Sequence, residues 1–211
     1  MRLKPKDLID NPEFELLFRL EHENVKEFVK EQLSRKSWIT KRYLWYQLSM
    51  LTLLTALVTS GLILWYVKST LAILFVMGAF CFTFTLLIFF HEMLHGLAFL
   101  LLGFKKISFG SDIRKFVFYA QADQQVLSRT EFYILALFPL VTIKIITVVA
   151  IVITIVTHSP WLWFWMIVMA LHSFFCAGDI GLISFFKHYP DKELFTFDSK
   201  IEKSSYFYNR K

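Results

Sequence analysis

The chain alternates between charged segments and long apolar segments. Between Arg42 and Lys68 lie 25 residues without a charged side chain, and two further apolar segments follow at 69–104 and 132–186. A helix needs roughly 20 apolar residues to cross a bilayer. Since His158-Ser159-Pro160 is a turn-forming sequence inside the last segment, the pattern predicts four membrane helices. Their expected ranges are 44–67, 70–103, 132–157 and 161–187.

The polar segments predict two smaller features. Asn11-Pro12 is typical of a helix start, and the apolar residues after it recur with a period close to 3.6, which predicts an amphipathic helix. Such a helix would lie on the membrane surface or bind a partner. Two β-prone runs, 105–109 and 115–120, surround Gly110-Ser111-Asp112 and predict a short hairpin between the second and third helices. The periodic apolar positions are Phe14, Leu17, Leu20, Val25, Phe28, Val29 and Leu33.

These elements together predict an all-α polytopic membrane protein with one small β-hairpin. The expected organisation has three parts: an amphipathic N-terminal arm over 1–42, a four-helix membrane region over 43–187, and a C-terminal tail over 188–211.

Composition and charge support a membrane location. The chain is 56% hydrophobic and only 19% charged, whereas a soluble domain carries about 25% charged residues. Ten Lys and Arg lie in residues 1–42 and five in 104–131, so the positive-inside rule places both termini and the hairpin in the cytoplasm of a multi-pass protein. Basic margins beside anionic lipid account for the net charge of +6, and no nucleic-acid partner is expected.

One apolar helix carries a run of ionisable residues, His91-Glu92-Met93-Leu94-His95. Four residues advance a helix by little more than one turn, so both imidazoles project from one face and can bind one metal ion. Glu92 lies beside them and could take a proton from water activated by the metal. Each buried ionisable group costs at least a few kcal/mol, which favours a compensating metal; a proton relay is the alternative.

A catalytic zinc site normally has three protein ligands, so a third is needed. Asp179 is the first candidate, because an unpaired carboxylate in the membrane is costly and Gly178 and Gly181 allow close approach of its helix. His172 and Lys144 are then the candidates to lie near the metal or to donate to a developing oxyanion. If Lys144 forms a salt bridge with Asp179, His172 becomes the ligand instead, and Cys176 is the remaining alternative.

On these residues the chain resembles the site-2 proteases, which are intramembrane zinc metalloproteases. It is more similar still to the small bacterial membrane proteins described as "Putative zincin peptidase". The resemblance covers roughly residues 44–187 and implies a bacterial cell-membrane protein that binds one Zn²⁺ per chain. It implies His91, His95 and Asp179 as the ligands and Glu92 as the catalytic glutamate. The chain departs from the site-2 protease pattern because Gly178-Asp179-Ile180 stands where Leu-Asp-Gly is usual.

The expected function is that of a zinc-dependent membrane endopeptidase. Its partner would be a membrane or membrane-proximal peptide, approached from the cytoplasm and held extended along residues 104–121. Two other classes use the same polar residues: a transporter or proton pathway, and a non-catalytic metal-binding partner protein.

Overall fold

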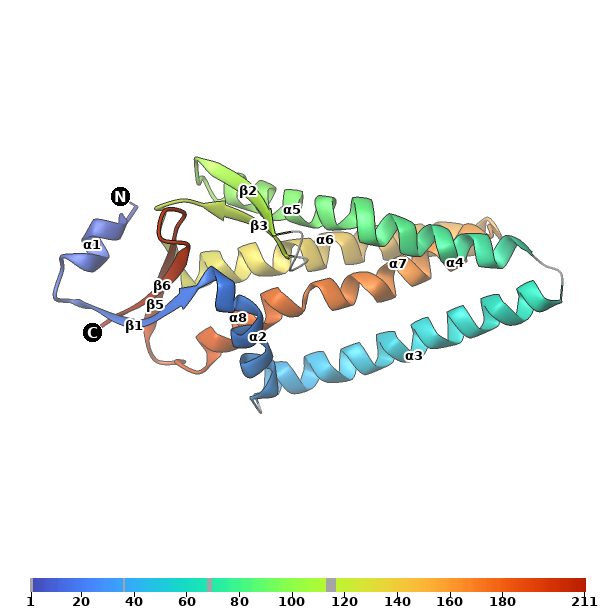
Figure 1. Ribbon diagram of the computed structural model, residues 1–211, viewed down its shortest axis with the longest axis horizontal. Coiled ribbons are helices and arrows are strands. Elements are labelled where there is room, and N and C mark those ends of the chain that lie inside the picture. Colours follow the sequence, from blue (N-terminus) through green and yellow to red (C-terminus); the bar gives the residue numbers. More distant parts are fainter. Residues whose placement is uncertain (1, 36, 68–69, 113–116) are drawn as a thin grey trace. The chain divides into compact units, whose positions relative to one another are not determined.

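The computed structural model of the chain, drawn in Figure 1, contains two compact units. The helical unit comprises Lys41–His91 and Pro139–Ala177. The sheet unit comprises Met1–Thr40, Glu92–Phe138 and Gly178–Lys211. The residues that the structure describes are 2–35, 37–67, 70–112 and 117–211.

Long apolar helices supply the helical unit. Two aromatic pairs pack α7 against α4. The ring centroids of Phe75 and Trp161 lie 5.1 Å apart, and those of Phe82 and Phe164 lie 5.5 Å apart. α4 continues through a π-helical turn, η2, into α5, so Thr70–Leu101 is a single span of 32 residues. The bounds are α3 Trp38–Tyr66, α4 Thr70–Phe82, η2 Thr83–Leu87, α5 Ile88–Leu101, α6 Arg129–Val156 and α7 Trp161–Phe175.

Within the described part of the chain, three helices are long and apolar enough to cross a membrane: α3, the Thr70–Leu101 span and α6. The pair α7 and α8 (Ala177–Lys187) is a fourth if its 43° bend belongs to one span. Only 6% of the most apolar window of α3 is buried. Such an apolar, exposed helix is typical of contact with lipid.

The sheet unit contains a four-stranded antiparallel sheet, and its strand order is β1-β6-β5-β4. The N-terminal segment supplies one edge strand, and the C-terminal segment supplies the two central strands. A separate antiparallel hairpin, β2-β3, follows α5. The bounds are α1 Pro5–Ile9, β1 Phe14–Glu21, η1 His22–Asn24, α2 Val25–Ser34, β2 Ile107–Asp112, β3 Val117–Ala122, β4 Leu127–Ser128, β5 Glu193–Ser199 and β6 Ser204–Arg210.

Phenylalanine rings join this sheet to α2 and α8. Phe207 of β6 contacts Phe185 of α8 at 4.9 Å between ring centroids, and Phe185 contacts Phe28 of α2 at 5.5 Å. Phe186 and Phe207 are almost completely buried. Because a buried phenylalanine stabilises a fold by roughly 1.5–3 kcal/mol, this cluster fixes α8 on the sheet.

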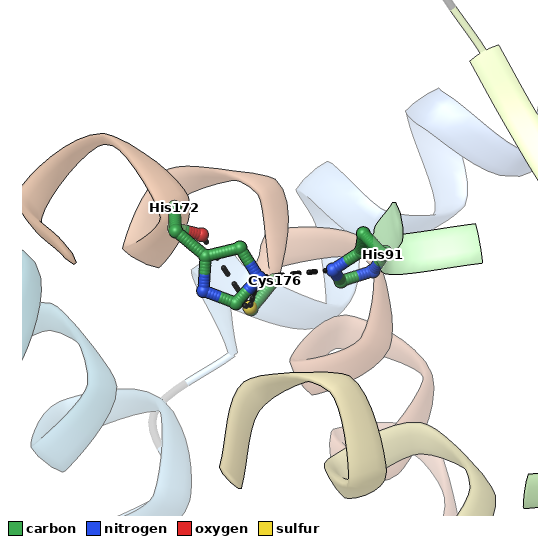
Figure 2. Close-up of side chains that lie close together, drawn as sticks. All are labelled: His91, His172 and Cys176. Atoms are coloured by element: carbon green, nitrogen blue, oxygen red, sulfur yellow. Dashed lines mark hydrogen bonds between the residues drawn. The ribbon is translucent and has the colours of Figure 1, made fainter. Parts of the chain in front are cut away.

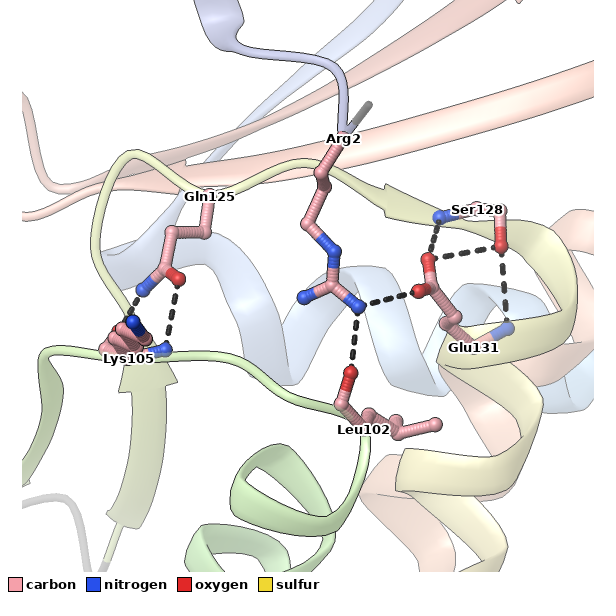
Figure 3. A network of polar contacts seen from close by, with 6 residues as sticks. All are labelled: Arg2, Leu102, Lys105, Gln125, Ser128 and Glu131. Atoms are coloured by element: carbon pink, nitrogen blue, oxygen red, sulfur yellow. Dashed lines mark hydrogen bonds and ion pairs between the residues drawn. The ribbon is translucent and has the colours of Figure 1, made fainter.

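Polar contacts hold the base of the hairpin beside the end of α5 (Figure 3). The Lys105 amide, before β2, donates to Gln125 Oε1, after β3, at 2.9 Å. The Gln125 amide group also donates to the Lys105 carbonyl. Arg2 donates to the Leu102 carbonyl at 2.6 Å and pairs with Glu131 at 2.9 Å. Glu131 in turn accepts from the Ser128 amide and hydroxyl, a capping box at the start of α6.

The prediction of an all-α protein is wrong, because residues at both ends of the chain form the four-stranded sheet. The signal was present in the tail. Aromatic residues alternate at Phe195 and Phe197 and at Tyr206 and Tyr208, and alternation of this kind is typical of strands. The charged residues around them led to the interpretation of 188–211 as a polar tail.

The predicted N-terminal amphipathic helix is also wrong over residues 14–21, which form β1. Leu17 is the extra residue of a bulge between Leu16 and Phe18, so Phe14, Leu17 and Leu20 are spaced by three and imitate a helical period. Asn11 is not a helix cap. Its side chain accepts from the Glu13 amide at 2.9 Å, in a turn that leads into the strand.

The predicted hairpin is confirmed as β2-β3, with one correction. Gly110-Ser111-Asp112 continue β2 instead of forming the turn, and residues 113–116 lie outside the described part of the chain, as does the connection at 68–69. The predicted helix over 161–187 is interrupted at Cys176, where α7 ends and α8 begins.

Candidate metal centre

The H-E-x-x-H sequence lies in the first half of α5, directly after the π-helical turn η2. His91 and His95 are buried, and Glu92 between them is half-buried. As α5 is a regular helix here, the two histidines are one turn apart on one face. Single π-helical turns occur often at functional sites.

In the sheet unit, His95 is held between a carbonyl group and a carboxylate. Its Nδ1 lies 3.1 Å from the Leu135 carbonyl of α6, and its Nε2 lies 3.3 Å from Asp179 Oδ1. A carbonyl oxygen can only accept, so Nδ1 carries the proton and the Nε2 lone pair of a neutral ring faces the carboxylate. Two acceptors in contact require a cation between them, which is a proton or a metal ion.

The distance between these two acceptors fits zinc. Zn²⁺ binds imidazole nitrogen and carboxylate oxygen at about 2.0–2.2 Å, which places two tetrahedral ligand atoms about 3.3 Å apart. Asp179 lies in the first turn of α8, where the helix dipole favours a negative charge. His95 and Asp179 are therefore of a suitable kind and at a suitable separation to bind one zinc ion together.

In the helical unit, His91 meets a second group of ligand atoms (Figure 2). His91 Nδ1 and His172 Nε2 share a hydrogen bond of 3.1 Å, and Cys176 Sγ lies 3.8 Å from His172 Nε2. His172 and Cys176 are completely buried. His172 is further fixed by its neighbour Ser173, whose carbonyl accepts from Tyr43 at 3.0 Å and from Gln47 at 2.6 Å.

The break at Cys176 changes the expected relation between His172 and Asp179. On one straight helix over 161–187, His172 and Asp179 would lie almost two turns apart on the same face. In the structure they belong to α7 and α8, and each contacts a different histidine of H-E-x-x-H. His172 and Asp179 therefore each contact one histidine of the motif, so one of them can be a ligand while the other supports a ligand.

Lys144 lies in the helical unit, where its Nζ is 4.8 Å from the centre of the Tyr46 ring. Among the described residues it has no hydrogen-bond partner. A cation over an aromatic face is a stabilising arrangement in an apolar setting. Its predicted role near the metal or the oxyanion stays a prediction.

Sequence reasoning missed the contact between the hairpin and α5. The Phe109 ring of β2 lies on Gly96, and a Cβ added to Gly96 would be 2.5 Å from Phe109 Cζ. Glycine at this position, next to His95, allows the strand to approach the helix. An isolated Gly directly after an H-E-x-x-H motif was the available signal. The Leu135 carbonyl, a backbone atom, gave no signal.

A helical H-E-x-x-H whose second histidine faces a carboxylate is typical of zinc-dependent peptidases. Comparison with known families agrees. The model of a family described as "Putative zincin peptidase" matches residues 84–194, just over half of the chain. The chain belongs to this family, and the family's description suggests a zinc metallopeptidase. No curated protein and no solved structure matches the chain.

Proposed function

We propose that the protein is a zinc-dependent membrane endopeptidase in which His91, His95 and Asp179 bind Zn²⁺ and Glu92 is the general base. The observation that carries this proposal is the arrangement around His95. Its protonated Nδ1 is held by the Leu135 carbonyl, and its Nε2 faces Asp179 at 3.3 Å. A hydrogen bond that orients the ring and leaves the other nitrogen for the metal is the usual environment of a zinc-binding histidine.

The same logic assigns His172 a supporting role. Its hydrogen bond to His91 Nδ1 leaves His91 Nε2 as the ligand atom, so both histidines of the motif would bind through Nε2. This arrangement favours Asp179 over His172 as the third ligand, because His172 is engaged with the far side of the His91 ring.

Zn²⁺, when bound, would acidify a water molecule and polarise the carbonyl group of the scissile peptide bond. Glu92 follows His91 directly in α5 and is half-buried, so its carboxylate is placed at the edge of the histidine face. It would take the proton from the attacking water and return it to the leaving amine. Burial of both histidines restricts the water that reaches them and so strengthens electrostatic interactions there.

The substrate would be a membrane or membrane-proximal peptide. The hairpin β2-β3 is a two-stranded sheet, so each of its strands pairs on one side only within that sheet. An extended peptide could add to such an edge by β-augmentation. Phe109 places β2 against the helix turn that follows His95, so a peptide on this edge would run close to the motif. By the positive-inside rule this face, with both termini, would be cytoplasmic.

Glu92→Gln tests the chemistry. The variant should retain zinc and lose cleavage of a co-expressed membrane substrate, whereas Glu15→Gln, on the exposed face of β1, should cleave normally. Equal cleavage by Glu92→Gln would show that Glu92 is not the general base, and absence of cleavage by the unmutated protein would favour a transport pathway or a metal-binding partner protein.

Metal analysis tests the ligands. Asp179→Ala and His95→Ala, each made in a Cys176→Ser background so that no metal is held by the thiol, should lose most of the bound zinc. An undiminished zinc content in Asp179→Ala would transfer the third-ligand assignment to His172.

A further inference from the structure

His91, His172 and Cys176 form a ligand set of their own. Their ligand atoms all lie within 4.8 Å of one another, and all three residues are buried. Two imidazoles and a thiol are a strong donor set for Zn²⁺ and for softer cations, and the same His₂Cys combination binds copper in blue-copper sites. The function proposed above uses His172 only as a hydrogen-bond partner and does not use Cys176.

The separations are close to those of a metal site. Tetrahedral coordination at the usual Zn–N and Zn–S distances places two nitrogens about 3.3 Å apart and a nitrogen and a sulfur about 3.6 Å apart. The structure has 3.1 Å between His91 Nδ1 and His172 Nε2, and 3.8 Å between His172 Nε2 and Cys176 Sγ. These two pairs would need adjustments of only a few tenths of an ångström for a cation to replace the hydrogen bond, and the pair of His91 and Cys176 lies within 4.8 Å.

We propose that His91 Nδ1, His172 Nε2 and Cys176 Sγ form a second metal position, which binds a thiophilic divalent cation. Binding would release one proton from the Cys176 thiol, and each imidazole would remain neutral with its proton on the other nitrogen. Since a neutral imidazole has one lone pair, His91 can bind a metal through Nδ1 or through Nε2 but not through both. The second position thus competes with the proposed catalytic position for His91.

Regulation by metal concentration follows from this competition, and this consequence rests on the proposed peptidase function. Low zinc would fill the catalytic set through His91 Nε2. Excess zinc or cadmium would occupy the position with Cys176, turn the His91 lone pair away from the catalytic set, and inhibit cleavage.

Cobalt spectroscopy tests the second position without reference to activity. The two cysteines of the chain are Cys81 and Cys176. The full-length Cys81→Ala protein therefore carries Cys176 as its single thiol. Co²⁺ bound to a thiolate gives a sulfur-to-metal charge-transfer absorption that nitrogen and oxygen ligands do not give. This absorption should appear on titration, disappear in Cys81→Ala/Cys176→Ser, and persist when His95→Ala is added.

Further variants make the test specific. His172→Gln in the same background should weaken cobalt binding at the thiolate at least tenfold, and Cys176→Ser, which is nearly isosteric, serves if His172→Gln does not fold. Absence of the thiolate absorption in folded Cys81→Ala protein at any cobalt concentration would overturn the proposal. An absorption that His172→Gln leaves unchanged would do the same.

The activity assay separates this proposal from the peptidase function. With both correct, the zinc concentration that halves cleavage should rise at least tenfold on adding Cys176→Ser to Cys81→Ala. Thiolate absorption without cleavage by the unmutated protein would support the second position and reject the peptidase. Cleavage without thiolate absorption would support the peptidase and reject the second position.

Discussion

Gly96→Ala should detach the hairpin from α5 while leaving the global fold nearly as stable as before. The added Cβ would lie 2.5 Å from Phe109 Cζ and 3.0 Å from Phe109 Cε1. Carbon atoms in favourable contact are about 3.5–4.0 Å apart, so the ring must retreat by roughly 1 Å or leave the helix.

The burial of Phe109 sets the magnitude. Its side chain is 58% exposed, so the contacts around it cover about two fifths of its surface. A phenylalanine has about 200 Å² to bury, so these contacts are worth at most about 2 kcal/mol at 25 cal/mol per Å². Loss of half of this, about 1 kcal/mol, increases the population with a detached β2 about fivefold. Globally, alanine stabilises a helix over glycine by about 0.5–1 kcal/mol, which offsets most of the loss.

Hydrogen exchange resolves the two effects. In detergent, the amides of 107–112 and 117–122 should exchange about fivefold faster in Gly96→Ala, with little change in the global unfolding midpoint. Gly78→Ala is the matched control, since a Cβ there meets nothing within 4 Å and the hairpin should not respond. In Phe109→Ala the contact with Gly96 is already lost, so adding Gly96→Ala should change little. Unchanged exchange in Gly96→Ala, or full additivity with Phe109→Ala, would refute the reasoning.

Three further predictions concern the sheet unit. Burial raises the pKa of the Asp198 carboxyl, so the folded chain keeps a proton that the unfolded chain loses. The stability of the fold should therefore decline as the pH rises from the ordinary Asp pKa through the raised value. Asp198→Asn should flatten this decline in thermal unfolding. Gly181→Ala places a Cβ 2.8 Å from Val29 Cγ1 and 3.3 Å from Val29 Cα, so it should lower the free energy of unfolding in denaturant titrations by about 1–3 kcal/mol. Gly178→Ala, whose Cβ meets nothing within 4 Å, should not have this effect. Phe207→Ala should lower the free energy of unfolding by about 3–5 kcal/mol, and Ile201→Ala, at an exposed position, by less than about 0.5 kcal/mol. Equal unfolding midpoints for these two variants would contradict the burial of Phe207 in the aromatic cluster.

The long apolar helices and the helical placement of H-E-x-x-H could be predicted because each depends on residues that are close in sequence. A long apolar run has no other stable state in a bilayer, and the spacing of His91 and His95 alone places them on one helix face. The break at Cys176 could not be predicted from periodicity, because the residues on both sides are apolar or small and carry no proline.

The environment of each histidine was also beyond prediction. The partner of His95 Nδ1 is a backbone carbonyl, which every residue possesses. The partner of His91 Nδ1 is His172, a residue that was noticed as a ligand but not as a hydrogen-bond partner. Polar residues in apolar helices show that partners exist, but the choice among them depends on tertiary contacts.

The sheet matters for the site because it supports the helix that carries Asp179. Phe185 and Phe186 of α8 pack on Phe207 of β6, and Val29 of α2 closes on Gly181 of the same helix. α8 has eleven residues and would be marginal alone, so its position depends on these contacts. The matched family segment ends at residue 194, inside β5, so it includes α8 but only the beginning of the central strands. The N-terminal arm and the C-terminal tail, which the sequence pattern set apart from the membrane region, are therefore part of what holds the candidate third ligand in place.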